Sequence, residues 1–310
     1  MTTTRSPVLL ILGNGHMQTA KFLDYQDWIH NAADKAGFTA ITATNLDFLA
    51  GNIGEAPLCT GEEKMPAIDA VLFADKDLPL ARAFEASGIP VFNNSQAVGV
   101  CDHKGQMHER LAASGLPTPD TVFAPFLYQK PKEMDLRFLD AVIHRLGLPI
   151  VVKEAYGSFG EQVHLAQSRE ELEALTLSLA GKPFLFQAFI KESRGEDLRL
   201  NVIGGEVIAA MRRTSETDFR ANVTAGGKTA PHEPTEAERA LAIAASRAVC
   251  ADFAGVDLLR TNDGPVICEV NTNPHIRSIH EATGIDIAPH MMAWIDKKIR
   301  QSVQVEGGPR

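Results

Sequence analysis

Three oxygen-bearing side chains stand in an otherwise apolar stretch of the C-terminal region, namely Asp257, Glu269 and Asn271. The residues at 262–264, Asn-Asp-Gly, predict a three-residue hairpin loop centred on Asp263, which sets Asp257 opposite Glu269. Asn271 then lies on the same face. Facing carboxylates in an apolar strand pair are costly unless a cation lies between them. The pattern predicts a site for Mg²⁺ or Mn²⁺. The alternative is a pair of strand-end carboxylates that face water or pair with arginine.

A second group of residues has the chemistry of a phosphate site. Lys153 ends the apolar run 150–153, and the segment 157–160, Gly-Ser-Phe-Gly, follows shortly after it. Glycines let backbone N–H groups approach phosphate oxygens closely, while a lysine supplies positive charge. The order differs from that of a P-loop, in which the lysine comes after the glycines. The pattern indicates a phosphate-binding loop, and the alternative is an ordinary hairpin with an exposed lysine.

The N-terminal part of the chain alternates short apolar runs with helical stretches. We expect strands at 8–12, 38–43, 69–74 and 89–92 and helices at 19–36 and 78–87. This alternation is typical of a small parallel α/β domain. The first turn, Gly-Asn-Gly at 13–15, is like a dinucleotide-binding turn, but Gln18 stands where the third glycine would be, so a plain strand–helix turn is favoured. His16, beside that turn, could still face a substrate.

From Asp102 onward the pattern changes. We expect helices at 104–114, 135–146 and 236–253 and strands at 148–154, 161–166, 198–203 and 206–212, with the carboxylate hairpin last. Gly204-Gly205 predict a two-residue turn, which sets Asp197 opposite Arg212 and offers a cross-strand ion pair as one role for Asp197. The tail 301–310 is expected to be loose.

Composition excludes several classes of protein. The chain has 310 residues, room for two or three domains, with 45% hydrophobic and 22% charged residues. Its net charge of -9 argues against a nucleic-acid-binding surface. Four cysteines without CxxC spacing predict free thiols in a reducing compartment. The apolar run 8–12 is too short for a signal-peptide core or a membrane span, so we expect a cytoplasmic protein without a membrane partner.

The order of the chemically active pieces is the strongest signal. The series resembles the ATP-grasp superfamily, and in particular its RimK-type (ribosomal-protein glutamate ligase-like) branch of carboxylate–amine ligases. The resemblance covers residues 98–295, including the run Thr-Gly-Ile-Asp-Ile-Ala at 283–288. In chain order the pieces are Lys104, Lys153, the loop 157–160, Gln187-Ala188-Phe189-Ile190, Asp197, Asp218-Phe219-Arg220-Ala221-Asn222, and the set Asp257, Glu269 and Asn271.

The resemblance implies an ATP-grasp fold of the α/β (α+β) class. A Rossmann-like pre-ATP-grasp domain would occupy residues 1–97, and two α+β subdomains would grip ATP between them. The central subdomain, at 98–186, would carry the Gly-rich loop. The C-terminal subdomain, at 187–300, would carry the metal site, and 301–310 would be a flexible tail.

The resemblance also implies roles for single residues. The phosphates of ATP would be held by Lys104 and Lys153 and covered by Gly157, Ser158, Phe159 and Gly160. The adenine would be received by Gln187, Ala188 and Phe189, with Asp197 near the sugar. The terminal phosphate would be reached by Arg220, Ala221 and Asn222, and the catalytic cations would be Arg220 and Lys153. The ligands of Mg²⁺ or Mn²⁺, expected as two ions, would be Asp257, Glu269 and Asn271.

The implied reaction is carboxylate activation: ATP converts a carboxylate into an acyl phosphate, which an amine attacks to give an amide, ADP and phosphate. The chain departs from the RimK-type pattern at 223–227, where no basic pair precedes the glycines, and at 272–277, where the branch tends to have Ala-Ser-Pro-Gly. Glutamate as the added amino acid is therefore in question. His275, Arg277 and His280 are candidates for gripping a substrate carboxylate, or are simply solvent-facing.

Other functions remain open at this point. One is a nucleotide-binding module without turnover, like synapsin-like relatives of the fold, and another is a D-alanine–D-alanine-type dipeptide ligase. The presence of Arg220 with the complete set of metal-ligating residues favours an enzyme. Its expected partners are ATP and small-molecule or peptide carboxylates and amines, with a homo-oligomer as the default assembly.

Overall fold

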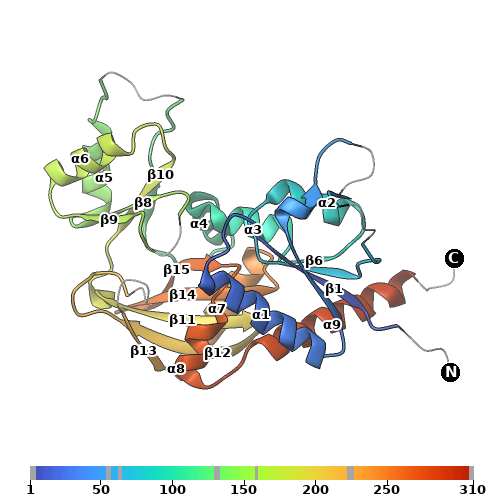
Figure 1. Ribbon diagram of the computed structural model, residues 1–310. Coiled ribbons are helices and arrows are strands. Elements are labelled where there is room, and N and C mark those ends of the chain that lie inside the picture. The colour runs from blue at the N-terminus through green and yellow to red at the C-terminus, as the bar shows by residue number, and fades with distance from the viewer. Residues whose placement is uncertain are drawn as a thin grey trace.

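The computed structural model describes residues 5–53, 57–61, 65–128, 133–157, 160–221 and 227–306. Within these residues the chain forms three larger sheets and a two-stranded ribbon (Figure 1). None of the helices described there is both long and apolar enough to cross a membrane.

The N-terminal sheet is parallel, with the strand order β2-β1-β5-β6. Its strands are β1 (Val8–Gly13), β2 (Thr39–Thr44), β5 (Ala70–Phe73) and β6 (Val91–Phe92). Helices α1 (Ala20–Lys35), α2 (Leu78–Ala86) and α3 (Ser95–Asp102) accompany it, and η1 (Asn45–Asp47) leads into the ribbon of β3 (Phe48–Leu49) and β4 (Leu58–Cys59). Strands β1 and β5 are buried along their whole length, as is typical of central parallel strands. The predicted parallel α/β unit is confirmed.

The second sheet is antiparallel, with the order β7-β10-β8-β9. Its elements are β7 (Thr121–Phe123), α5 (Phe138–Leu146), β8 (Ile150–Glu154), β9 (Val163–Ala166), α6 (Arg169–Ser178) and β10 (Phe184–Ala188). We call these elements the central unit. They stand to one side of the other two sheets, at the upper left of Figure 1. Among the described residues, the core of this unit is drawn entirely from positions 122–186.

The third sheet has the order β13-β12-β11-β14-β15. Its strands are β11 (Glu196–Ile203), β12 (Glu206–Thr214), β13 (Lys228–Pro231), β14 (Phe253–Thr261) and β15 (Gly264–Asn271), and η2 (Lys191–Ser193) precedes them. Helix α4 (Lys104–Ala113) and helix α7 (Glu236–Ala248) supply buried residues to one core cluster of this sheet, among them Met107 and Leu241. Helix α7 begins at the predicted capping box of Thr235 and Glu238 but ends before Phe253, which is the first residue of β14.

The N-terminal and C-terminal sheets share a hydrophobic core, and we call the two together the body. Leu9 of β1 and Ile29 of α1 belong to the same buried cluster as Phe253 of β14 and Ile295 of α9. Helices α8 (Ile276–Thr283) and α9 (Ala288–Glu306) complete this cluster. Helix α9 continues to Glu306 and so includes the first part of the tail that was expected to be loose; residues 307–310 lie outside the described part of the chain.

The hairpin β14–β15 pairs as expected although its loop is not the predicted one. Thr261 pairs with Gly264, so the loop has two residues and not three. A bulge between Asp257 and Leu258 then shifts the register by one, and Asp257 lies opposite Glu269. The bulge offsets the shorter loop, and the two carboxylates therefore face each other across the strands.

The hairpin β11–β12 differs from the prediction by the same kind of irregularity. Its turn is Gly204-Gly205, as predicted, because Ile203 pairs with Glu206. A register shift between Asn201 and Val202 places Asp197 opposite Arg213, so the predicted pairing of Asp197 with Arg212 is wrong. The consequence is large, since the Arg213 side chain is 6% exposed and that of Arg212 is 48% exposed.

Candidate active site

The central unit and the body enclose a cavity of about 1080 Å³. Its lining comes from the β1–α1 turn, α4, β8, β10, β11, β15 and the start of α8. Of the predicted site residues within the described part of the chain, those lining the cavity are Lys104, Lys153, Gly157, Gly160, Gln187, Ala188, Phe189, Asp197, Arg220, Ala221, Asp257, Glu269, Asn271, His275 and Arg277. Ser158, Phe159 and Asn222 lie outside the described residues.

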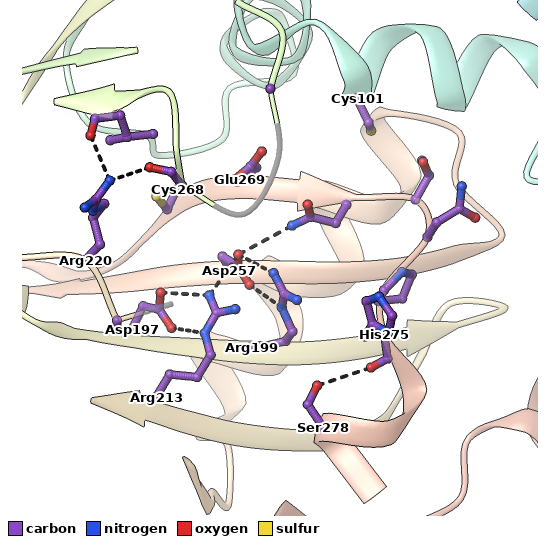
Figure 2. Close-up of a pocket in the computed structure, with 18 of the residues that line it drawn as sticks. Cys101, Asp197, Arg199, Arg213, Arg220, Asp257, Cys268, Glu269, His275 and Ser278 are labelled. Carbon is purple, nitrogen blue, oxygen red and sulfur yellow. Dashed lines mark hydrogen bonds and ion pairs between the residues drawn. The ribbon is translucent and has the colours of Figure 1, made fainter. Parts of the chain in front are cut away.

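An ion-pair network forms one wall of the cavity (Figure 2). Arg199 donates to both oxygens of Asp257, at 2.7 and 2.6 Å, and Arg213 donates to both oxygens of Asp197, at 2.6 and 2.7 Å. Arg213 also lies 3.0 Å from Asp257. Burial raises the pKa of the Asp257 carboxyl, yet the two guanidiniums outweigh burial and hold that pKa below its usual value. Asp257 is therefore ionised and fixed in place.

Glu269 and Asn271 extend this wall along β15. A carboxylate oxygen of Glu269 lies 3.6 Å from the ammonium of Lys104. The Asn271 side-chain nitrogen donates to Gly255 O at 3.3 Å and to Asp257 at 3.4 Å, so its amide oxygen is the atom left to face a cation. Figure 2 shows Glu269 and Asp257 on neighbouring strands of the same sheet.

This donor set fits a hard divalent cation bound together with phosphates. It offers two carboxylates and an amide oxygen, the ligands that Mg²⁺ accepts alongside water and substrate oxygens. Within the described residues there is no cluster of three or more His, Cys, Asp or Glu side chains that could hold a metal alone. A cation here would therefore need phosphate oxygens to complete its coordination.

Two buried lysines point at the glycine-rich segment and the wall. The ammonium of Lys104, 6% exposed as a residue, donates to Gly157 O at 2.9 Å. The ammonium of Lys153, 7% exposed, lies 3.7 Å from Cys268 Sγ. Gly157 has φ 140°, and a Cβ there would meet the Gln162 side chain at 2.4 Å, so only glycine fits. Two buried ammonium groups beside a glycine-rich segment have the charge that suits a bound anion.

Arg220 reaches from the body to the central unit. Its guanidinium pairs with Asp218 at 2.7 Å and donates to the carbonyl oxygens of Gly160 and Val163, the latter at 3.1 Å. The side-chain hydrogen bond from Arg220 lowers the pKa of Asp218. Arg220 therefore lies beside the glycine-rich segment, and its pairing with Asp218 fixes the orientation of its guanidinium.

The predicted adenine segment divides between a buried strand end and the cavity. The side-chain nitrogen of Gln187 donates to His108 Nε2 at 3.0 Å and to Thr121 Oγ1 at 2.9 Å, and Gln187 is 2% exposed. Burial lowers the pKa of His108 to about 3, so its ring is neutral and can accept. Ala188 and Phe189, at and after the end of β10, also line the cavity.

The four predicted substrate residues separate into different environments. His275 lines the cavity beside the rings of Phe22 and Tyr25, and burial lowers its pKa to about 4. Arg277 also lines it, and its Nε and one Nη donate to Asp24 of α1. The other two are not among the described residues that line the cavity: His16 is exposed on the β1–α1 turn, and His280 packs on Trp28.

Several lining residues were not found from the sequence. Arg199 could have been, because it alternates with Leu198 and Leu200 in a strand and so had to face away from the apolar side. Asn14 and Asp75 come together from the ends of β1 and β5, with Asn14 Nδ2 donating to Asp75 Oδ1 at 3.1 Å. They are 61 residues apart, and no local pattern links them.

Comparison with known proteins decides the family. The family model described as a RimK-like ATP-grasp domain matches residues 101–295. The chain belongs to the RimK-like ATP-grasp family. It is similar to a probable alpha-L-glutamate ligase of Thioalkalivibrio sulfidiphilus, with 36% identity over 71% of each chain. It is also similar to the ribosomal protein bS6–L-glutamate ligase of Escherichia coli, with 37% identity over 76% of this chain and 78% of that protein.

Solved structures agree on the fold. The D-alanine–D-alanine ligase of Bacillus anthracis complexed with ATP matches with a TM-score of 0.70 at 20% identity, covering 97% of this chain and all of the other. A RimK domain protein of Sphaerobacter thermophilus matches with a TM-score of 0.68 at 20% identity, covering 93% and 99%. The ATP-grasp ligase PsnB was solved with Mg and ADP. This RimK-like chain is thus an ATP-dependent carboxylate–amine ligase.

Proposed function

We propose that the enzyme uses ATP to activate the carboxylate of an amino acid, peptide or small metabolite as an acyl phosphate and transfers the acyl group to an amine, all within the cavity described above. The observation that carries this proposal is the placement of three cations, Lys104, Lys153 and Arg220, around a glycine-rich segment and opposite the Asp257–Glu269 wall. Cations on one side and oxygen ligands on the other suit a polyphosphate with its metal.

The chain's own residues act by positioning and charge compensation. Lys104 and Lys153 hold the phosphates that leave as ADP, and Arg220 neutralises the charge that develops on the terminal phosphate. A substrate carboxylate oxygen attacks the terminal phosphorus, and the bond to ADP breaks. The amine nitrogen then attacks the acyl carbon, phosphate leaves, and the nitrogen releases a proton. Ala188 and Phe189 hold the base outside this region.

We propose that the wall residues Asp257, Glu269 and Asn271 would hold magnesium, expected as two ions. Bound there, the metal supplies charge neutralisation on the phosphate oxygens. Asp257 is the most rigid of the three, because Arg199 and Arg213 fix both of its oxygens. Glu269 is more exposed, at 28% of its side chain, and lies 3.6 Å from the ammonium of Lys104.

The substrate end of the cavity lies between the β1–α1 turn and the start of α8. The curated relatives are named as glutamate ligases. This chain carries Thr-Asn-Pro-His-Ile-Arg at 272–277 and has no basic pair at 223–227. Its own carboxylate and amine substrates are therefore to be identified by assay, and glutamate is not assumed. We retain the division into 1–97, 98–186 and 187–300 as the domain proposal.

The experiment is a phosphate-release assay with Mg-ATP and pools of amino acids, supplied singly and in pairs. The proposal predicts ADP and phosphate in equal amounts, and only with particular carboxylate and amine pairs. ATP binding without ADP formation in any pool would favour the synapsin-like binding module. A product pair of AMP and pyrophosphate would contradict the acyl phosphate.

A further inference from the structure

Asp75 is a buried carboxylate at the cavity that the proposed chemistry leaves without a role. It follows the C-terminal end of β5, lines the cavity and is 7% exposed. Its Oδ1 accepts from Asn14 Nδ2 at 3.1 Å and from the backbone N–H of Lys76 at 2.7 Å. Its Oδ2 is buried and has no hydrogen-bond partner among the described residues.

This half-satisfied carboxylate differs from the two aspartates of the wall, Asp257 and Asp197. Both oxygens of Asp257 accept from arginine, and so do both oxygens of Asp197. Lys76, the residue next to Asp75, pairs with Asp102. A buried carboxylate oxygen without a donor is costly, because it has lost water and gained nothing in return. An unmatched acceptor of this kind calls for a donor supplied by a ligand.

The position of Asp75 brings it to the reacting end of the proposed site. Turned so that its nitrogen faces them, the side-chain amide of Asn273 donates to Thr272 O and Phe73 O, at 3.1 and 3.3 Å, and so ties the end of β15 to the end of β5. Asp75 is two residues beyond Phe73, and the proposed metal ligand Asn271 is two residues before Asn273. Ligands of parallel sheets bind at the carboxyl ends of the strands, where Asn14 and Asp75 both lie.

We propose that Asp75, oriented by Asn14, binds the protonated amino group of a substrate. An ionised carboxylate only accepts hydrogen bonds, so its partner must be a donor, and a cationic donor also matches its charge. An ammonium group is the donor that the two substrates of a carboxylate–amine ligase can both carry. The group belongs either to the attacking amine before it loses its proton or to an amino acid that supplies the carboxylate. This inference rests on the proposed function.

The test compares Asp75→Asn with Asp69→Asn. Asparagine keeps the shape of Asp75 and the acceptor for Asn14 but removes the charge. Asp69 comes directly before the first residue of β5 and accepts a hydrogen bond from the backbone N–H of Val8 at 2.7 Å. It is not among the described residues that line the cavity, so it is the matched control. Both variants are assayed for amide formation, and for hydroxamate formation with hydroxylamine in place of the amine, using the substrate pair found in the pool assay.

The expected result is a rise of about tenfold or more in KM for one substrate of Asp75→Asn, with KM for ATP and the melting temperature unchanged. If only KM for the amine rises, and Asp75→Asn forms the hydroxamate as the wild type does, the bound amino group belongs to the amine substrate. A rise in KM for the carboxylate in the hydroxamate assay assigns it to the carboxylate substrate. Should Asp75→Asn not fold, Asp75→Ser carries the same test.

Unchanged KM values for both substrates would overturn the inference and leave the proposed function standing. An equal loss of activity in Asp75→Asn and Asp69→Asn would also overturn it, because it would mark a structural role for both ends of β5. Wild-type enzyme that forms no hydroxamate with any carboxylate would overturn the proposed function, and the inference with it.

Discussion

The body and the central unit of this molecule are built in opposite ways. In the body, strand β1 and helix α9 come from opposite ends of the chain and bury Leu9 and Ile295 in one continuous core. The central unit buries its own residues, such as Phe186 and Ile150, and its core takes none from outside 122–186 in the described part of the chain. The apolar core of the body fixes two sheets relative to each other, whereas none of the hydrophobic clusters formed by the described residues joins the central unit to the body.

Polar contacts of the proposed phosphate-binding residues join the central unit to the body. Lys104 donates to Gly157 O, Lys153 lies against Cys268, and Arg220 donates to Val163 O. A cationic side chain can donate to a phosphate oxygen in place of a protein carbonyl at low cost. Apolar side chains of a buried core cannot be separated and exposed to water at low cost. The difference indicates that nucleotide binding and the position of the central unit are coupled through the same side chains.

The largest effect is expected on turnover, from a substitution in the wall of the cavity that the body provides. Glu269→Gln should reduce turnover on the order of 10³-fold or more, because a neutral amide weakens metal placement, while the fold is kept. Steady-state phosphate release with the substrate pair checks this. Glu206→Gln, an exposed position at the start of β12, is the control and should retain activity. Full activity of Glu269→Gln would remove this residue from the site.

The next effect is on the stability of the body. Arg213→Met should lower the free energy of unfolding by about 3 to 5 kcal/mol, because it leaves Asp197 without its bidentate partner in a buried position. Arg212→Met, next to it on the strand but half-exposed, should change stability by about 1 kcal/mol or less. Urea unfolding measures both, and equal losses would contradict the register described for β11 and β12.

A pair of core substitutions tests the comparison itself. Phe186→Ala and Ile295→Ala should each cost about 3 kcal/mol, since both side chains are fully buried. Hydrogen exchange should show faster exchange confined to the central unit for Phe186→Ala. For Ile295→Ala it should rise in both the N-terminal and the C-terminal sheets. Exchange that rises across the whole molecule in both variants would mean that the two parts unfold as one.

The smallest effect, counted per pH unit, concerns the contact between α4 and β10. His108 has a pKa lowered to about 3 in the folded protein, below its ordinary value of 6.5. The unfolded chain therefore binds a proton that the folded one does not, and stability falls as pH drops from about 6.5 toward 3, by about 1 kcal/mol per pH unit. Above pH 6.5 this contribution is constant. His108→Asn should reduce the slope of unfolding free energy against pH, and an unchanged slope would contradict the buried neutral ring.

Much of the fold followed from local patterns in the sequence. Alternating apolar runs predicted the parallel N-terminal sheet, and Thr235 with Glu238 predicted the start of α7. The facing pair Asp257 and Glu269 was also predicted, although the loop was one residue shorter than expected and a bulge restored the register. A bulge depends on packing against the rest of a sheet, and single-strand patterns do not show it.

The site was harder to predict where partners are distant in sequence. Arg277 was a candidate for gripping a substrate carboxylate, and no pattern in the sequence indicated that it also pairs with Asp24, 253 residues away. A regular hairpin without a register shift predicts that Asp197 lies opposite Arg212. The register shift in β11 places Asp197 opposite Arg213 instead. Residue type indicated in each case that the side chain forms an ion pair, while the tertiary structure determines which residue is its partner.

The central claim, that a carboxylate is activated as an acyl phosphate in this cavity, is tested most directly by following oxygen. The enzyme is incubated with Mg-ATP, an amine pool and amino acids labelled with ¹⁸O in their carboxylates, and the released phosphate is analysed by mass spectrometry. The account predicts ADP together with phosphate that carries a single ¹⁸O from the carboxylate. Unlabelled phosphate, or label found in AMP, would contradict it.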